Sequence, residues 1–471
     1  MTGIPPLPAE LRTRARGLGR RFPEGFVWGA ATAAPQIEGS VSAEGRTPSI
    51  WDTFARIPGT VAGGDTLDDA DDHFRRWRDD ISLMRDLGIG AYRFSVAWPR
   101  IVPGSDGVPN RGGLDFYDRL VDELLASGID PFVTLYHWDL PQWQQDAGGW
   151  AARSTAYRFV EYATHVTDRL GDRVRHWTTL NEPWVYVFLG HLLGVHAPGE
   201  RSEAPAVRAM HHSLLAHGLG VQALRTALPV DSHVGIALSM SPTEPATPEA
   251  DDVAAAERND LYRNWLFLHP ITRGEYHPLT GELFAEPIPI HSGDLEAIAE
   301  PIDFVGINYY ARAVVRADES VAVTRAQETR PDGTYTAMGW EVYPQGIADI
   351  VAQTHARYAP EAIYITENGS AWDDEPAADG SIVDRERVAY LLGHLDAATQ
   401  STDAGLPLRG YFAWSLMDNF EWAEGYTKRF GIVGVDYATQ LRTVKQSGAV
   451  YREVLAAHRE AAGDEGKPAR P

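Results

Sequence analysis

Two kinds of hydrophobic segment alternate along the chain from Phe22 onward. Short runs of apolar, β-branched and aromatic residues are typical of buried strands, and longer segments between them repeat apolar residues every three or four positions, as amphipathic helices do. This alternation indicates a parallel sheet covered by helices. The eight predicted strands are residues 26–32, 91–96, 130–137, 176–181, 233–239, 303–308, 362–366 and 408–414.

The helical periodicity is clearest in the segment that ends at Gly88. Trp77, Ile81 and Met84 lie there at spacings of three and four, and the glycine is a common helix terminator. The eight predicted helices are residues 71–87, 114–126, 155–170, 206–227, 253–267, 346–358, 385–404 and 447–458. Eight strands alternating with eight helices predict the α/β class and a single (β/α)8 TIM barrel with elaborated βα loops.

The domain organisation follows from the extent of this pattern. No low-complexity linker interrupts it, so we predict one barrel domain at residues 22–458. Residues 1–21 form an N-terminal extension, and the small, polar residues 459–471 form a tail that we expect to be mobile. The longest irregular stretch, residues 311–343, is predicted to be a loop elaboration beside the functional site.

Composition narrows the classes of partner and location. The 471 residues carry a net charge of −23, which argues against nucleic acid and anionic membrane as partners. There is no Cys, so disulfides and thiolate metal sites are excluded. No segment approaches 18 consecutive apolar residues or resembles a signal peptide, so a cytoplasmic location is expected, and a homo-oligomer is compatible with the sequence.

Three histidines on one predicted helix invite a comparison with metal sites. His211, His212 and His217 share the segment 206–227. We expect surface or packing roles for them, because no carboxylate–histidine site accompanies them. The sequence therefore predicts no metal and no cofactor.

Two glutamates stand where predicted strands end. Glu182 follows Asn181 and precedes Pro183, and Glu367 precedes an Asn-Gly pair. Active sites of barrels lie at the carboxyl ends of the strands, and two carboxyl groups there are what glycoside hydrolysis needs. Taken singly, Glu182 is also compatible with a strand-end salt bridge and Glu367 with an exposed turn. The occurrence of both, at strands four and seven, favours a catalytic pair.

The two carboxyl groups would need different pKa values. A nucleophile must stay ionised, which a nearby guanidinium favours, and Arg93 at the end of the second strand is our candidate, although it is also compatible with a surface arginine. Apolar surroundings and a neighbouring carboxylate would raise the pKa of Glu182 and keep it protonated.

Ordered motifs over residues 22–458 resemble glycoside hydrolase family 1, the β-glucosidases and their relatives. They are FPEGFVWGAAT (22–32), QIEG (36–39), YRFS (92–95), YHWDLP (136–141), TTLNEP (178–183), NYY (308–310), IYITENG (363–369) and WSLMDNFEW (414–422).

The resemblance implies a role for each matching residue. Glu182 would be the acid/base and Glu367 the nucleophile of a retaining double displacement, with Tyr310 hydrogen-bonded to the nucleophile. Trp414 would form the floor under the sugar ring and Trp340 a wall of the leaving-group site. The remaining ligands of the glycoside substrate would be Gln36, His137, Trp138, Asn181, Asn308, Glu421 and Trp422.

Ordinary structural roles remain open for several of these residues. Gln36 and His137 are compatible with satisfied strand-end polar groups, and Trp414 and Trp422 with core aromatics. The chain also departs from the family pattern at Pro35 and His191, where aromatic residues are usual. We expect these departures to affect the rim of the cleft and the leaving-group preference.

The resemblance implies an exo-acting β-glucosidase that releases terminal β-D-glucose from short glucosides and disaccharides, as in cellulose breakdown. Side activity on β-galactosides and β-fucosides, and transglycosylation, are expected. One alternative is a 6-phospho-β-glycosidase, although Glu421 would repel a phosphate at the sugar 6-position. Another is an inactive sugar-binding protein, which the presence of both Glu182 and Glu367 disfavours. Thioglucosidase relatives replace the acid/base by an amide, unlike Glu182.

Overall fold

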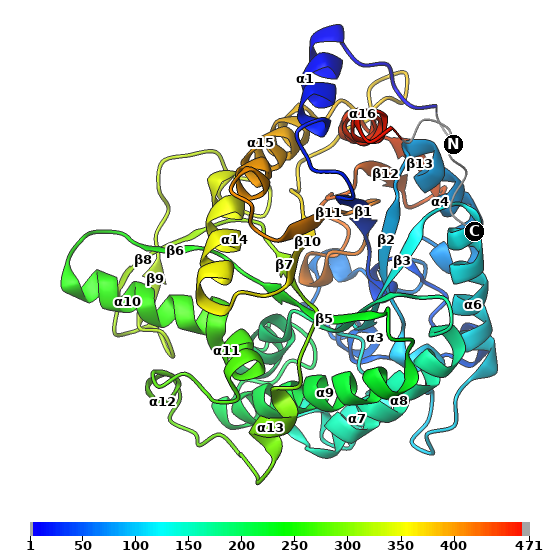
Figure 1. Cartoon of the computed structure of the whole chain (residues 1–471). Helices are drawn as coiled ribbons and strands as arrows, with labels where there is room; N and C mark the ends of the chain where they lie inside the picture. The colour runs from blue at the N-terminus through cyan, green and yellow to red at the C-terminus, as the bar shows by residue number, and fades with distance from the viewer. Residues whose placement is uncertain (1–2, 464–471) are drawn as a thin grey trace.

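The computed structural model describes residues 3–463 of the chain, and it is built around a closed barrel of eight parallel strands. The first strand pairs with both the second and the last, which closes the sheet and confirms the predicted (β/α)8 barrel (Figure 1). The barrel strands are β1 (Val27–Ala31), β2 (Ala91–Ser95), β3 (Asp130–Tyr136), β4 (His176–Asn181), β5 (His233–Ser239), β7 (Phe304–Asn308), β10 (Ala362–Asn368) and β11 (Leu408–Trp414).

Helices surround the barrel and bury apolar side chains against it. In α4 (His73–Leu87), Trp77, Ile81 and Met84 are buried, and the helix ends at Gly88 in the left-handed conformation that glycine tolerates. The other long helices are α6 (Arg111–Ala126), α8 (Ser154–Leu170), α9 (Glu203–Ala227), α14 (Gln345–Tyr358), α15 (Arg385–Asp403) and α16 (Gln446–Ala461).

The predicted helix at 253–267 differs from the structure. Three consecutive pieces occupy the region: α10 (Ala250–Asp260), the π-helix η5 (Leu261–Trp265) and α11 (Leu266–Arg273). A second π-helix, η4 (Val185–Leu192), follows β4. The short helices are α2 (Ala34–Ile37), α3 (Ile50–Phe54), α5 (Trp98–Ile101), α7 (Gln142–Asp146), α12 (Thr280–Leu283), α13 (Asp294–Ile298), η1 (Ala43–Gly45), η2 (Ala62–Gly64), η3 (Gly149–Ala151) and η6 (Trp422–Glu424).

The prediction that residues 311–343 are irregular is wrong in part. They contain β8 (Ala313–Ala317) and β9 (Ala326–Glu328), which form a small sheet with β6 (Thr243–Pro245) beside α10 (Figure 1). The predicted position beside the site fits, because Ala311, Arg312 and Trp340 line the central cavity. A further hairpin joins β12 (Val433–Asp436) to β13 (Leu441–Val444).

The N-terminal extension contains a helix, α1 (Ala9–Gly19), which packs on α16. Arg16 forms an ion pair with Glu453, and a Cβ at Gly19 would lie 2.1 Å from the carbonyl oxygen of Val454. The close approach explains the small residue at position 19. The predicted tail begins inside α16, which ends at Ala461, and residues 464–471 of that tail lie outside the described residues.

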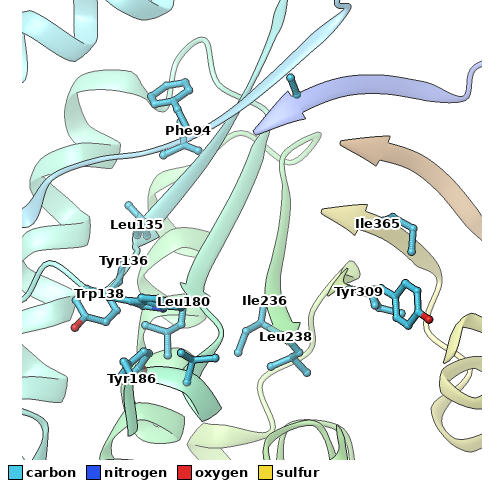
Figure 2. Close-up of a cluster of buried hydrophobic side chains, with 14 of the residues drawn as sticks. Phe94, Leu135, Tyr136, Trp138, Leu180, Tyr186, Ile236, Leu238, Tyr309 and Ile365 are labelled. Carbon is cyan, nitrogen blue, oxygen red and sulfur yellow. The ribbon is translucent and has the colours of Figure 1, made fainter. Parts of the chain in front are cut away.

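Neighbouring residues of a barrel strand point to opposite faces of the sheet, so that some side chains pack in the hydrophobic core and others reach the barrel interior. Buried side chains such as Phe94, Leu180 and Ile236 pack in the hydrophobic cluster of Figure 2, while the neighbouring Arg93 and Asn181 bond to each other across the barrel interior. One strand therefore supplies both packing and chemistry. None of the helices within residues 3–463 is both long and apolar enough to span a bilayer.

Candidate active site

The carboxyl ends of the barrel strands surround a cavity of about 350 Å³. Glu182 directly follows β4, and Glu367 lies near the end of β10. Most of the predicted site residues line this cavity, namely His137, Trp138, Glu182, Asn308, Tyr310, Trp340, Glu367, Trp414, Glu421 and Trp422. The structure thus brings together side chains that are far apart in the sequence.

Both oxygens of the Glu367 carboxylate accept hydrogen bonds. Arg93 Nη1 donates to one oxygen at 2.6 Å, and the Tyr310 hydroxyl donates to the other at 2.7 Å. Burial raises the pKa of Glu367, while Arg93 and Tyr310 oppose that rise by stabilising the charged form. A carboxylate held in this way can act as a nucleophile.

Glu182 has a less favourable setting for negative charge. Asn308 Nδ2 donates to its Oε1 at 3.0 Å, and a cation contacts Glu367 instead. Burial, followed by the charge of Glu367, raises the pKa of Glu182 to about 8. A pKa of about 8 favours the protonated form of Glu182 at neutral pH, so the group can act as an acid.

Asn181 is the hub behind these two carboxyl groups. Its Oδ1 accepts from Arg93 Nη2 at 2.6 Å and from Asn308 Nδ2 at 3.0 Å, which fixes the orientation of its amide. The amide nitrogen therefore donates to His137 Nε2 at 3.0 Å, and the proton of His137 must sit on Nδ1. Burial and the charge of Arg93 lower the pKa of His137 well below its usual range, so its imidazole is neutral.

Several buried polar atoms at the site have no hydrogen-bond partner among the described residues 3–463. They include Oε1 of Gln36, Nδ1 of His137 and Oε2 of Glu421, as well as Nε1 of Trp184 and Nδ1 of His196. Gln36 is fixed from behind, because its Nε2 donates to the carbonyl oxygen of Phe420 at 2.8 Å. Buried polar atoms normally have partners, so these atoms can bind the hydroxyl groups of a ligand.

Burial and the charges of Glu367 and Glu182 raise the pKa of Glu421 to about 8. A large share of Glu421 is therefore neutral at pH 7, and the charge repulsion of a phosphate that we expected from the sequence is weaker than expected.

Aromatic rings form the walls of the cavity. Trp138 and Trp422 pack with ring centroids 4.3 Å apart, and Trp138 Nε1 donates to the carbonyl oxygen of Asn181 at 2.9 Å. Trp414 is buried in the cluster that also contains Phe430, while Trp340 is partly buried against Tyr310. Such flat apolar surfaces suit the faces of sugar rings.

Sequence reasoning missed several cavity-lining residues. Trp184 and Arg263 both line the cavity, and the Arg263 guanidinium lies 3.9 Å from the centroid of the Trp184 ring. His196 and Phe430 also contribute to the lining. Trp184 could have been noticed as the aromatic residue two positions beyond Glu182, but nothing in the sequence pattern singled out Arg263.

The two departures from the family pattern do not line the cavity. Pro35 is buried in the first turn of α2, and His191 is buried with its Nδ1 3.0 Å from Oε2 of Glu200. Neither residue contacts the cavity directly, so an effect of either on the rim or on the leaving-group preference would be indirect and stays a prediction.

The three helical histidines have partners within the protein. His211 Nε2 lies 2.8 Å from Asp294, His212 Nδ1 lies 3.1 Å from the carbonyl oxygen of Trp150, and His217 Nδ1 lies 2.7 Å from the hydroxyl of Thr179. All three are buried, which fits the expected packing role.

A closed parallel barrel with two carboxyl groups and several tryptophans around its central cavity is the arrangement of a barrel glycosidase. Residues 18–460 match the pattern of glycosyl hydrolase family 1. The chain belongs to this family.

Similar proteins carry β-glucosidase names. The chain is 49% identical over 438 residues to beta-glucosidase A of Thermotoga maritima, covering 93% of this chain and 98% of the relative. It is 44% identical to a bifunctional beta-D-glucosidase/beta-D-fucosidase of Bifidobacterium breve, covering 93% and 98%. A solved family 1 β-glucosidase from Thermotoga maritima superposes with a TM-score of 0.91 at 48% identity, covering 93% of this chain and 99% of that chain.

Proposed function

We propose that the protein is a retaining exo-β-glucosidase that hydrolyses terminal non-reducing β-D-glucosyl residues of short glucosides and disaccharides. The single observation that carries the proposal is the asymmetry of the carboxyl pair. Glu367 accepts hydrogen bonds from the cation of Arg93 and from Tyr310, both of which oppose the rise in its pKa, whereas Glu182 accepts from the neutral amide of Asn308 and its pKa is raised to about 8. The β-glucosidase names of the relatives support the choice of sugar.

The mechanism uses the two groups in sequence. An oxygen of Glu367 forms a bond to the anomeric carbon while the bond from that carbon to the glycosidic oxygen breaks, and the proton of Glu182 passes to the departing oxygen. Glu182, now ionised, takes a proton from water, and the water oxygen displaces Glu367 from the anomeric carbon. Two inversions give net retention of the anomeric configuration.

Glucose binding would use the unpartnered atoms and the aromatic walls. Gln36 Oε1 and Glu421 accept from sugar hydroxyls, and His137 donates through Nδ1. Asn181 has one amide hydrogen left after its bond to His137, and this hydrogen is the donor for the 2-hydroxyl. The ring face would rest on Trp414.

Related sugars and acceptors follow from the same site. Activity on β-fucosides is supported by the bifunctional name of the Bifidobacterium breve relative, and β-galactosides differ from glucosides by one epimeric hydroxyl. An alcohol in place of water in the second step gives transglycosylation. A relative from Thermotoga neapolitana is named 1,4-beta-D-glucan glucohydrolase, which supports a role late in cellulose breakdown. The cytoplasmic location and a homo-oligomeric state stay predictions.

The test is a panel of initial rates. Nitrophenyl β-glucoside, β-galactoside, β-fucoside and β-glucoside 6-phosphate are compared for the wild type and for Glu367→Ala, with circular dichroism as the check on folding. We expect the glucoside to be turned over, the mutant to be inactive, and azide to restore turnover with an inverted product. Turnover of the phosphate alone would establish the 6-phospho-β-glycosidase, and no turnover of any substrate would favour the sugar-binding protein.

A further inference from the structure

Arg263 is an arginine of the cavity wall without a carboxylate partner. Within the described residues 3–463, neither a hydrogen bond nor an ion pair reaches its guanidinium, and its contact is with the ring of Trp184. Arg312 lines the same cavity but pairs with Glu341 at 2.8 Å and with Glu244 at 3.0 Å. The charge of Arg312 is therefore compensated, whereas that of Arg263 is available to a ligand.

The surroundings of Arg263 hold it in place. It lies in the π-helix η5, and its neighbour Asn264 donates to the carbonyl oxygen of Ser241 at 2.8 Å and accepts from the nitrogen of Ser241 at 2.7 Å. Tyr262 packs edge-on against Trp184, with ring centroids 5.3 Å apart. Trp184 therefore contacts both Tyr262 and Arg263. Irregular helical turns of this kind often occur at functional sites.

The position of Trp184 and Arg263 relative to Glu182 bears on what they can bind. Trp184 lies two residues beyond Glu182, and the charge of Arg263 acts on Glu182 by lowering its pKa. The acid must lie beside the glycosidic oxygen, because it protonates that oxygen as the leaving group departs. Trp184 and Arg263 line the cavity near Glu182, where a leaving group can reach them.

We propose that the Trp184–Arg263 pair is a leaving-group subsite that selects aromatic aglycones bearing a carboxylate. This inference rests on the proposed glycosidase function and deepens it by naming the class of leaving group. The exposed part of the indole offers apolar contact to an aromatic ring, and the guanidinium that lies over the indole matches a carboxylate in a bidentate geometry that Lys cannot provide.

The cavity lining also contains two further carboxylates. They belong to Glu328 and Glu424, and both would repel an anionic substituent. The preference for a carboxylate therefore depends on Arg263. Without this cation, a carboxylated substrate is expected to be poorer than a neutral one, not merely equal to it.

The test compares matched pairs of substrates. Carboxyphenyl and carbamoylphenyl β-glucosides, each as the 3- and 4-isomer, differ in charge and little in shape. They are assayed with the wild type, Arg263→Met and Arg263→Lys, and melting temperatures check that each variant is folded. A substitution at Arg263 changes the pKa of Glu182 equally for both members of a pair. The ratio of their kcat/KM values therefore isolates the contact with the leaving group.

For at least one isomer, we expect the wild type to favour the carboxylate by about tenfold in kcat/KM, through a lower KM, as a charged hydrogen bond allows. Arg263→Met should bring the ratio below one, and Arg263→Lys should restore part of it. The preference should weaken with added salt. An unchanged ratio in Arg263→Met for both isomers would overturn the subsite. Failure of the wild type to cleave any of the four glucosides would instead count against the proposed function.

Discussion

Removing the negative charge of Glu367 should lower the pKa of Glu182. Burial raises this pKa to about 8 together with the negative charge of Glu367. Glu367→Gln removes the charge but keeps the size of the side chain and an oxygen that can accept from Tyr310. The variant therefore separates the electrostatic contribution from burial.

The size of the effect follows from the spacing of the two groups. In retaining glycosidases the carboxyl groups lie about 5–5.5 Å apart. At an effective dielectric constant of about 20, two unit charges at this separation interact by about 3 kcal/mol, which corresponds to about two pH units. The pKa of Glu182 should therefore fall to about 6 in the variant. Formation of the glycosyl-enzyme also neutralises Glu367, so the same change would convert Glu182 from acid to base between the two steps.

The assay is a carbon-13 NMR titration of protein labelled at the glutamate carboxyl carbons. The Glu182 resonance is assigned by its loss in the double variant Glu182→Gln/Glu367→Gln. Asp379→Asn serves as a control that also removes one negative charge. The pKa of Glu182 should stay unchanged in this variant, because the Asp379 carboxylate is exposed and does not line the cavity. A pKa of Glu182 that stays near 8 in Glu367→Gln would refute the coupling and leave burial as the sole cause.

Three further substitutions test separate parts of the structure. Arg93→Met leaves the buried carboxylate of Glu367 without its cation, so the acidic limb of the kcat/KM profile should move to higher pH; an unmoved limb would contradict the role of the ion pair. Burial lowers the pKa of His394 to about 3, so the folded state loses stability as pH falls below about 6.5, by about 2 kcal/mol at pH 5. His394→Gln should reduce the difference in urea unfolding free energy between pH 7 and pH 5, and an equal difference would contradict this. In Gly369→Ala the new Cβ would lie 1.6 Å from the carbonyl oxygen of Trp414, so a lower melting temperature and lower activity are expected, whereas a wild-type melting temperature would show that the backbone relaxes without penalty.

The barrel could be predicted from the sequence because its signals are local. Each strand is a short apolar run and each long helix has a three-to-four repeat, so the predicted and observed strands differ by at most two residues at either end. The carboxyl pair was predictable for a related reason, since Glu182 and Glu367 end two such runs and sit in motifs that resemble the family.

Features set by tertiary contacts could not be predicted. The π-helical turn at 261–265 lies within an apolar repeat that predicted a single helix, and the π-helical turn at 185–192 was not predicted as a helix. The small sheet formed by β6, β8 and β9 joins segments whose pairing no local pattern reveals. Arg263 is distinguished by its contact with Trp184 and by the lack of an acidic partner within residues 3–463, and both features arise only in the folded chain.

The central claim, that Glu367 becomes covalently bonded to the sugar, is tested most directly by trapping the intermediate. A 2-deoxy-2-fluoroglucoside with a good leaving group should accumulate as a glycosyl-enzyme, because the fluorine slows both steps while the good leaving group keeps the first step fast. Peptide mass spectrometry should then find the fluorosugar on the peptide that contains Glu367 and nowhere else. A label on any other residue, or turnover with inversion and no labelled peptide, would contradict the assignment of Glu367 as the nucleophile.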